Sequence, residues 1–316
     1  MSETQRPNGV MRGAFETTGS CRLVMYVIKK LELDAKHGFL LDIRYVKDEV
    51  QRSLESVEVA LQEGSTDIIS IDWISVARER AHGIPITAGV PYGRTIGGLV
   101  ARQDSSIQSL EDLPGKRIGV VRKVDKNWII TRAACLKRYG FDPQREATVV
   151  EALSKSKLTY RLETGDVEAG LQFWQLIPHL TVSGKFRQVV DMIDLLPYLG
   201  VQKMIPFSIF TFRDEFVQRQ PQTIRAYARA FADAVDYMKQ NDDIWEELRE
   251  KMLPEETPEV VHALRDRWRA RVMTNWNEET IRNIKLFFEE MLKVGGKEVL
   301  GVDRIPEGTF TLGLTA

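Results

Sequence analysis

Residues 107–121 read IQSLEDLPGKRIGVV and hold two elements separated by a stop. The Ser-Leu-Glu-Asp-Leu part predicts one helical turn, which the following Pro-Gly pair ends. The apolar run at 117–121 has the length of a buried strand. A helical pattern follows from about 127 to 139 and stops at Gly140. This part of the chain therefore predicts a helical turn, a strand and a helix in succession.

The same alternation of apolar run, turn and amphipathic helix continues on both sides of this segment. Strands are predicted at residues 10–15, 41–46, 67–71, 85–90, 97–102, 147–150, 167–171, 188–190 and 206–212. Helices are predicted at residues 23–31, 53–62, 73–81 and 155–163, and the chain after about 220 is helical. Repeated strand–helix–strand units are typical of a parallel, doubly wound α/β sheet.

The alternation breaks twice, near residues 93–97 and near 200–206. Both breaks predict a crossover between two halves of the molecule. The first lobe would be discontinuous, with residues 1–93 and 205–316, and the second lobe would span residues 97–202. Two chain crossings of this kind act as a hinge, and the cleft between the lobes is a natural ligand site.

Composition narrows the class of protein. The 316 residues are 43% hydrophobic and 28% charged, and 44 basic residues against 45 acidic ones give a net charge of −1. Without a basic excess we expect no nucleic-acid partner. No run of 18 apolar residues exists, so we expect no direct insertion into a membrane. Residues 1–7 lack the pattern of a secretory signal, so the protein is periplasmic if a signal peptide was removed and cytoplasmic otherwise.

The segment at 107–120 resembles the pattern I-x-S-L-x-D-L-x-G-K-x-I-G-V of the NMT1/THI5-like family, the nitrate, sulfonate, taurine and thiamine-pyrimidine solute-binding proteins. Weaker echoes occur in the family's order at residues 64–68, 81–86, 165–173 and 216–221. The resemblance implies the type II periplasmic-binding-protein fold and a monomer that binds a small-molecule ligand without a cofactor. It also implies an ABC transporter permease as the partner that receives the ligand.

In open α/β sheets, ligands bind beyond the carboxyl ends of the strands, where helix N-termini converge. Four such turns are predicted, at residues 16–21, 72–75, 123–128 and 173–175. The family has small residues at these turns where this chain has tryptophans, so a bulkier and more aromatic pocket is expected. The candidate ligand-binding residues are Thr17, Thr18, Gly19, Ser20, Cys21, Asp72, Trp73, Tyr92, Lys123, Asp125, Trp128, Phe173 and Trp174.

Other roles compete with ligand binding at these positions. Asp72 and Asp125 stand where a helix N-cap belongs, and about half of the aromatic residues would serve packing. Tyr92 could be a hinge residue. Helix N-termini favour an anionic ligand, whereas the carboxylates of Glu16, Asp72 and Asp125 favour an amine or a pyrimidine-like donor. The charge of the ligand stays open.

A catalytic alternative centres on Cys21, which lies at a predicted helix N-terminus that would lower its thiol pKa. Sulfinate desulfinases of the same fold look similar at this turn, but their histidine and Arg-Gly-Gly segment have no match here. A pyrimidine-synthesising protein of the family would need a cysteine-rich motif, and this chain has two cysteines. The four histidines are scattered without metal-ligand spacing. We therefore expect a binding protein with no catalytic or metal-ligating residues.

Overall fold

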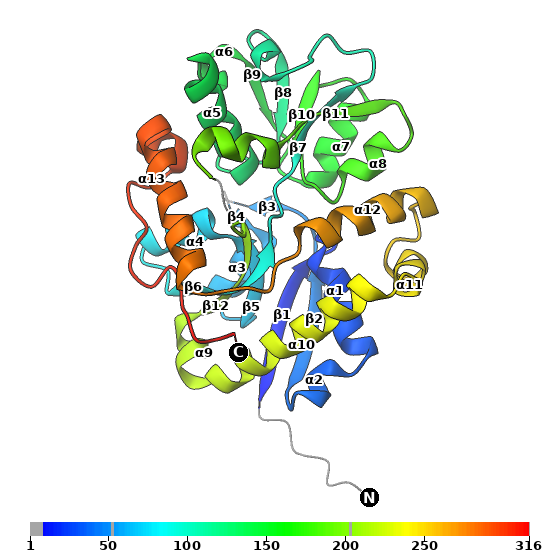
Figure 1. The fold of residues 1–316 in the computed structure, drawn as a ribbon, viewed down its shortest axis with the longest axis vertical. Coiled ribbons are helices and arrows are strands. Elements are labelled where there is room, and N and C mark those ends of the chain that lie inside the picture. The colour runs from blue at the N-terminus through cyan, green and yellow to red at the C-terminus, as the bar shows by residue number, and fades with distance from the viewer. Residues whose placement is uncertain (1–8, 52–53, 202–203, 316) are drawn as a thin grey trace, which may run out of the picture.

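The computed structural model describes residues 9–51, 54–201 and 204–315. Two lobes stand one above the other, each built on a five-stranded sheet with helices against it (Figure 1). This architecture agrees with the predicted two-lobed α/β fold class. Among the described residues, none of the helices combines the length and the apolar character that a bilayer crossing requires.

The sheet of the first lobe combines strands from the two ends of the chain. Its strand order is β2 (Leu40–Val46), β1 (Val10–Glu16), β5 (Ile68–Asp72), β12 (Ser208–Arg213) and β6 (Ile86–Gly93). β1 runs parallel to β2 and β5, whereas β12 runs antiparallel to both of its neighbours. A two-stranded hairpin, β3 (Val50–Gln51) with β4 (Leu54–Glu55), follows β2.

Nine helices among the described residues accompany this sheet. They are α1 (Cys21–Lys30), α2 (Leu33–Lys36), α3 (Ser56–Gln62), α4 (Trp73–Ala81), α9 (Asp214–Arg219), α10 (Pro221–Gln240), α11 (Asp243–Met252), α12 (Pro258–Arg271) and α13 (Glu278–Leu300). The apolar faces of α1 and α10 pack with Phe210 and Phe212 in one core. A second core joins α3, α4 and α13 and continues into the second lobe through α5.

The sheet of the second lobe has the order β11 (Phe186–Asp191), β7 (Gly98–Arg102), β10 (Ala169–Gln172), β8 (Arg117–Val120) and β9 (Thr148–Glu151). β8 runs parallel to β9 and β10, and β7 runs antiparallel to β10 and β11. The helices of this lobe are η1 (Leu110–Asp112), α5 (Lys126–Tyr139), α6 (Pro143–Glu146), α7 (Lys155–Glu163), α8 (Ile177–Thr181) and η2 (Met192–Leu199).

The expectation of purely parallel sheets is wrong. β7 and β12 are the strands that enter a sheet directly from the other lobe, and each runs antiparallel to its neighbours. A strand that arrives this way has no helical crossover behind it, so the rule that makes strand–helix–strand units parallel does not apply to it.

Two segments of chain connect the lobes, one between β6 and β7 and one between η2 and β12. Residues 202–203 of the second predicted hinge lie outside the described residues. In the first connection, a Cβ atom on Gly97 would lie 1.8 Å from the carbonyl oxygen of Gln172, so this position requires glycine. The lobe boundaries inferred from sequence stay a prediction, with the strands of the two sheets falling on either side of them.

Candidate functional site

A cavity of about 60 Å³ lies between the lobes. Strand ends and helix starts of the first lobe form one wall, and residues of α5, α7 and the turn after β10 form the other. The lining residues are Glu16, Gly19, Ser20, Cys21, Glu55, Ser70, Ile71, Asp72, Tyr92, Thr95, Lys126, Lys155, Phe173, Trp174, Gln175 and Ser208. Seven of the thirteen predicted ligand-binding residues are in this set, namely Gly19, Ser20, Cys21, Asp72, Tyr92, Phe173 and Trp174.

The turn between β1 and α1 brings a hydroxyl and main-chain groups to the cavity. Ser20 occupies the N-cap position of α1, but its hydroxyl makes no capping hydrogen bond. Its Oγ instead accepts a hydrogen bond of 2.8 Å from the Tyr92 hydroxyl, which itself accepts one of 3.1 Å from Trp268 Nε1. This buried chain of donors fixes Tyr92 as part of the cavity wall.

Asp72 lines the cavity and also caps α4. Its Oδ1 accepts a hydrogen bond of 2.9 Å from the Ser75 amide, and its Oδ2 accepts one of 2.9 Å from the Ser75 hydroxyl. The Ser75 hydroxyl in turn accepts a hydrogen bond of 2.8 Å from Arg78. Both oxygens of Asp72 are therefore already used within the first lobe, which fits the capping role.

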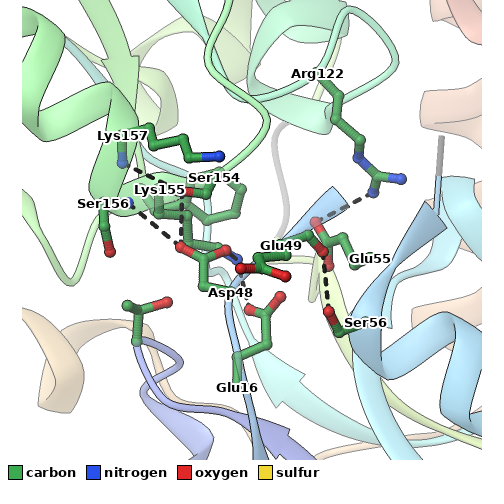
Figure 2. A network of polar contacts seen from close by, with 12 residues as sticks. Glu16, Asp48, Glu49, Glu55, Ser56, Arg122, Ser154, Lys155, Ser156 and Lys157 are labelled. Carbon is green, nitrogen blue, oxygen red and sulfur yellow. Dashed lines mark hydrogen bonds and ion pairs between the residues drawn. The ribbon is translucent and has the colours of Figure 1, made fainter. Parts of the chain in front are cut away.

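Ion pairs cross from one lobe to the other beside the cavity (Figure 2). Lys155 of the second lobe places its Nζ 2.5 Å from Glu16 Oε2 and 3.1 Å from Asp48 Oδ1, both in the first lobe. Arg122 of the second lobe pairs with Glu55 at 3.2 Å. It also pairs with Glu58 at 3.1 Å. We call these two cations and four carboxylates the interlobe clamp.

Burial and the neighbouring charges shift the pKa values of three clamp carboxyl groups, those of Glu16, Glu55 and Glu58. Burial raises the pKa of Glu16 to about 7, against the lowering effect of Lys155. Burial also raises the pKa of Glu58 to about 7, although Arg122 opposes it. For Glu55 burial acts in the same direction, but the charges of Lys155 and Arg122 outweigh it and lower its pKa to about 2. The clamp therefore holds a proton-accepting group that titrates near neutral pH.

Glu16 lines the cavity, and one of its carboxylate oxygens is buried and unpaired among the described residues. Its Oε2 binds Lys155, whereas its buried Oε1 has no hydrogen-bond partner in the part of the chain described. Next to it, the Phe173 ring lies between two ammonium groups, with Lys126 Nζ 4.9 Å and Lys155 Nζ 4.8 Å from the ring centroid. Among the described residues, the cavity lining therefore has two buried acceptors without a partner, Glu16 Oε1 and Gln175 Oε1, and an aromatic ring close to two cations.

Trp73 and Trp128 do not line the cavity, and in place of the predicted ligand contact they have the packing role that was predicted for about half of the aromatic residues. Trp73 is fully buried, and its ring lies 6.2–6.5 Å from the rings of Phe207, Phe287 and Phe288. Trp128 is also fully buried and donates a hydrogen bond of 2.9 Å from Nε1 to Gln144. Both tryptophans lie in the first turn of their helices, and their side chains pack in the core and not in the cleft.

The two polar residues of the turn before α5 also lie elsewhere. Asp125 is a buried N-cap that accepts a hydrogen bond of 2.7 Å from the Asn127 amide. Lys123 is exposed, and its amide donates to Glu151. Neither lines the cavity, so Asp125 has the predicted alternative role of a cap, and Lys126 takes the place expected for Lys123.

Cys21 lines the cavity, but the expected low thiol pKa is wrong. The thiol is buried, and burial raises its pKa to about 12, beyond what the hydrogen bonds from Ser70 and Tyr92 offset. At neutral pH Cys21 is therefore a protonated thiol, because desolvation outweighs the field of the helix N-terminus.

Besides Lys126, three charged residues of the cavity lining were not among the predicted ligand-binding residues. Lys155 begins a helix directly after β9, so the rule that placed the other turns could have found it. Glu16 ends β1 and was noted only for its charge. Glu55 belongs to the hairpin β3–β4, whose two-residue strands leave no periodic signal.

Thr17 and Thr18 line a second, larger pocket of about 340 Å³ outside the first cavity. Its wall also contains α12 and the loop before it. The apolar members are Leu23, Leu176, Met252, Leu253, Pro254, Val260 and Leu264. Gly19, Ser20 and Gln175 line both the cavity and this pocket. Gln175 of the second lobe spans the junction, where its Nε2 donates a hydrogen bond of 3.3 Å to the Thr18 carbonyl.

Within the described ranges, no three His, Cys, Asp or Glu side chains are grouped to hold a metal ion.

Solved structures share this two-lobed architecture. The alkanesulfonate-binding protein SsuA from Xanthomonas axonopodis pv. citri, bound to MOPS, superposes with a TM-score of 0.77 at 15% identity and covers 98% of this chain and 99% of its own. The periplasmic aliphatic sulphonate binding protein SsuA from Escherichia coli gives a TM-score of 0.68 at 15% identity over 93% of this chain and 99% of its own. These likenesses show the periplasmic-binding-protein fold that the sequence predicted.

Sequence comparisons give the family. A curated relative, the 4-amino-5-hydroxymethyl-2-methylpyrimidine phosphate synthase of Legionella pneumophila, is 27% identical over 172 residues, which are 53% of this chain and 51% of that protein. The chain thus spans about half the length of the curated relatives it matches. The family model described as NMT1/THI5 like matches residues 41–243, more than half of the chain. The protein therefore belongs to the NMT1/THI5-like family.

Proposed function

We propose that this protein is a solute-binding protein, which encloses a small molecule between its lobes and delivers it to the permease of an ABC importer. The observation that carries the proposal is the interlobe cavity, whose wall is shared between the two lobes. A site divided in this way is completed only when the lobes close, so binding and closure are coupled. Gly19, Ser20, Cys21, Tyr92, Phe173 and Trp174 are the proposed ligand-contacting residues among those predicted.

In this proposal, residues 1–93 with 205–316 move as one body and residues 97–202 as the other, about the two connecting segments. The working compartment is the periplasm, and the protein acts as a monomer. The named functions of the SsuA proteins, sulfonate binding in both, support a binding role for this chain. They do not determine the ligand, because a likeness at 15% identity shows the fold alone.

The names of the curated relatives support a second candidate, the synthesis of a pyrimidine phosphate. A synthase transforms what it binds, whereas a solute-binding protein releases its ligand unchanged. The solved structures with a printed binding role superpose on 93–98% of this chain, whereas the synthase from Legionella pneumophila aligns with 53% of it, and this favours the binding role. In the desulfinase-like alternative, Cys21 would be the nucleophile only after losing a proton that burial holds tightly.

A thermal-shift screen against sulfonates, nitrate, pyrimidines, flavins and aromatic acids tests the proposal. A true ligand at 100 times its Kd stabilises the protein by about 2.7 kcal/mol, which raises the melting temperature by several degrees. Each compound that binds is then incubated with the protein and recovered for mass spectrometry, where we expect an unchanged mass. The Cys21→Ser variant should bind the same compound. A chemically altered compound, altered less by Cys21→Ser, would establish the enzyme instead.

A further inference from the structure

The interlobe cavity is too small for a ring in this conformation. Its volume is about 60 Å³, whereas a protein cavity that holds benzene has about 150 Å³. The cavity thus has room for a head group the size of an ammonium or aminomethyl group. Anything larger must extend from the cavity into neighbouring space.

That space is the apolar pocket of about 340 Å³, which lies within the range of small-molecule sites. The two spaces have Gly19, Ser20 and Gln175 in common, so they adjoin at the N-terminus of α1, with these three residues between them. Leu253 and Leu264 are among the side chains that make the outer pocket apolar. An aliphatic or aryl tail would bury its surface there.

The charges of the inner cavity favour a donor as the head group. Three carboxylates and two ammonium groups line it, and Lys155 is already paired with Glu16 and Asp48. Glu16 Oε1 is buried without a partner among the described residues, and the side chain is only 9% exposed. An unpaired buried carboxylate oxygen is costly, and an N–H donor from a ligand removes that cost.

Lys126 is the competing feature. Its ammonium makes no hydrogen bond or ion pair within the part of the chain that is described, and it lies over the Phe173 ring. An anionic head would bind there. Lys126 has the ring as a partner and faces the cavity, however, whereas Glu16 Oε1 has nothing.

From these observations, and resting on the proposed function, we infer that the cavity and the outer pocket form one site for an amphiphilic amine. Its protonated amino group donates to Glu16 Oε1, and its apolar tail passes Gln175 into the pocket beside Leu253 and Leu264. The ligand class is thus a primary amine or amidine that carries an aliphatic or aryl tail.

Isothermal titration calorimetry at pH 8 with butylamine, hexylamine and octylamine tests the inference, with hexanoate and hexan-1-ol as matched controls. At this pH Glu16 is ionised and the amines are protonated. We expect hexylamine to bind at least tenfold more tightly than hexanoate or hexanol. Affinity should rise about three- to fourfold for each methylene that enters the pocket.

Two variants distinguish the contribution of the ligand's amino group to the affinity from that of its apolar tail. Glu16→Gln should weaken hexylamine binding at least tenfold, and Leu253→Ala should reduce the gain from hexylamine to octylamine. Lys157→Met, an exposed change on the same helix as Lys155, should leave hexylamine affinity unchanged. Because Glu16→Gln also alters the clamp, a second measurement uses the unmodified protein. The affinity of the unmodified protein for hexylamine should fall about tenfold for each pH unit below 7, because Glu16 takes up a proton.

Three outcomes overturn the inference while leaving the proposed function in place. One is hexanoate binding more tightly than hexylamine, which would assign the head to Lys126. The second is an affinity that does not change with chain length or pH. The third is no amine binding at all while another compound of the screen binds. The proposed function itself fails on a separate result, the recovery of a chemically altered compound.

Discussion

Replacing Lys155 with methionine should open the lobes. The side chain is 4% exposed, and its ammonium lies 2.5 Å from Glu16 and 3.1 Å from Asp48, which are 9% and 5% exposed. Removing one partner of a buried ion pair costs about 3–5 kcal/mol, because the other charge stays buried and unpaired. Here two carboxylates lose the same cation. The closed form of Lys155→Met is therefore destabilised by a factor of about a hundred to a few thousand relative to an open form in which water reaches both carboxylates.

Double electron–electron resonance measures this opening as a change in the distance between two spin labels, one in each lobe. Labels at Tyr160 in the second lobe and Arg219 in the first sit on exposed side chains, while Cys21 and Cys135 are buried. We expect a longer and broader distance distribution for Lys155→Met than for the parent protein. Lys157→Met, two residues along the same helix and exposed, is the matched control. If Lys155→Met and Lys157→Met gave the same distribution and the same melting temperature, the clamp would not hold the lobes together.

Two further predictions concern stability. Trp73→Ala should lower the free energy of unfolding in urea by about 3–5 kcal/mol, because it empties a fully buried site among phenylalanine rings. Its ligand affinity should be unchanged. Lost binding with unchanged stability would contradict the placement of Trp73 in the core. The free energy of unfolding should fall between pH 5 and pH 8, because Glu16 and Glu58 have folded pKa values of about 7, above their usual range. The proton that each group binds in the folded state stabilises the protein. This stabilisation is complete below about pH 4.5 and is lost as the pH rises through 7. Glu55, with its pKa of about 2, acts only at lower pH, and Glu16→Gln should reduce the slope; a stability that rises from pH 5 to 8 would refute the assignment.

The elements that the sequence predicted are those with a strong period or a clear stop. α4 and α5 were placed within one residue, because an apolar strand precedes each and a turn follows the strand. The hairpin β3–β4 escaped because two-residue strands have no period, and with it went Glu55. The turns before α4 and α5 were thus predictable from the sequence, whereas the contribution of Glu55 to the cavity was not.

The direction in which a side chain points depends on partners far away in the chain. Trp73 packs against Phe287 and Phe288 of α13, more than two hundred residues later, and no local pattern around Trp73 contains that information. For the same reason the pairing of Lys155 with Glu16 could not be inferred from either residue alone. A position just after a strand predicts that a residue lies near the cleft. Whether its side chain faces the cleft depends on how that side chain packs against distant parts of the chain.

The tight approach of Gly97 to the Gln172 carbonyl ties the first connection between the lobes to the wall of the cavity. Gln172 directly precedes Phe173, whose ring contacts both Lys126 and Lys155. Even one added methyl group at residue 97 would displace the main chain that aims this aromatic ring. A substitution at residue 97 would therefore alter both the connection between the lobes and the position of a cavity-lining ring.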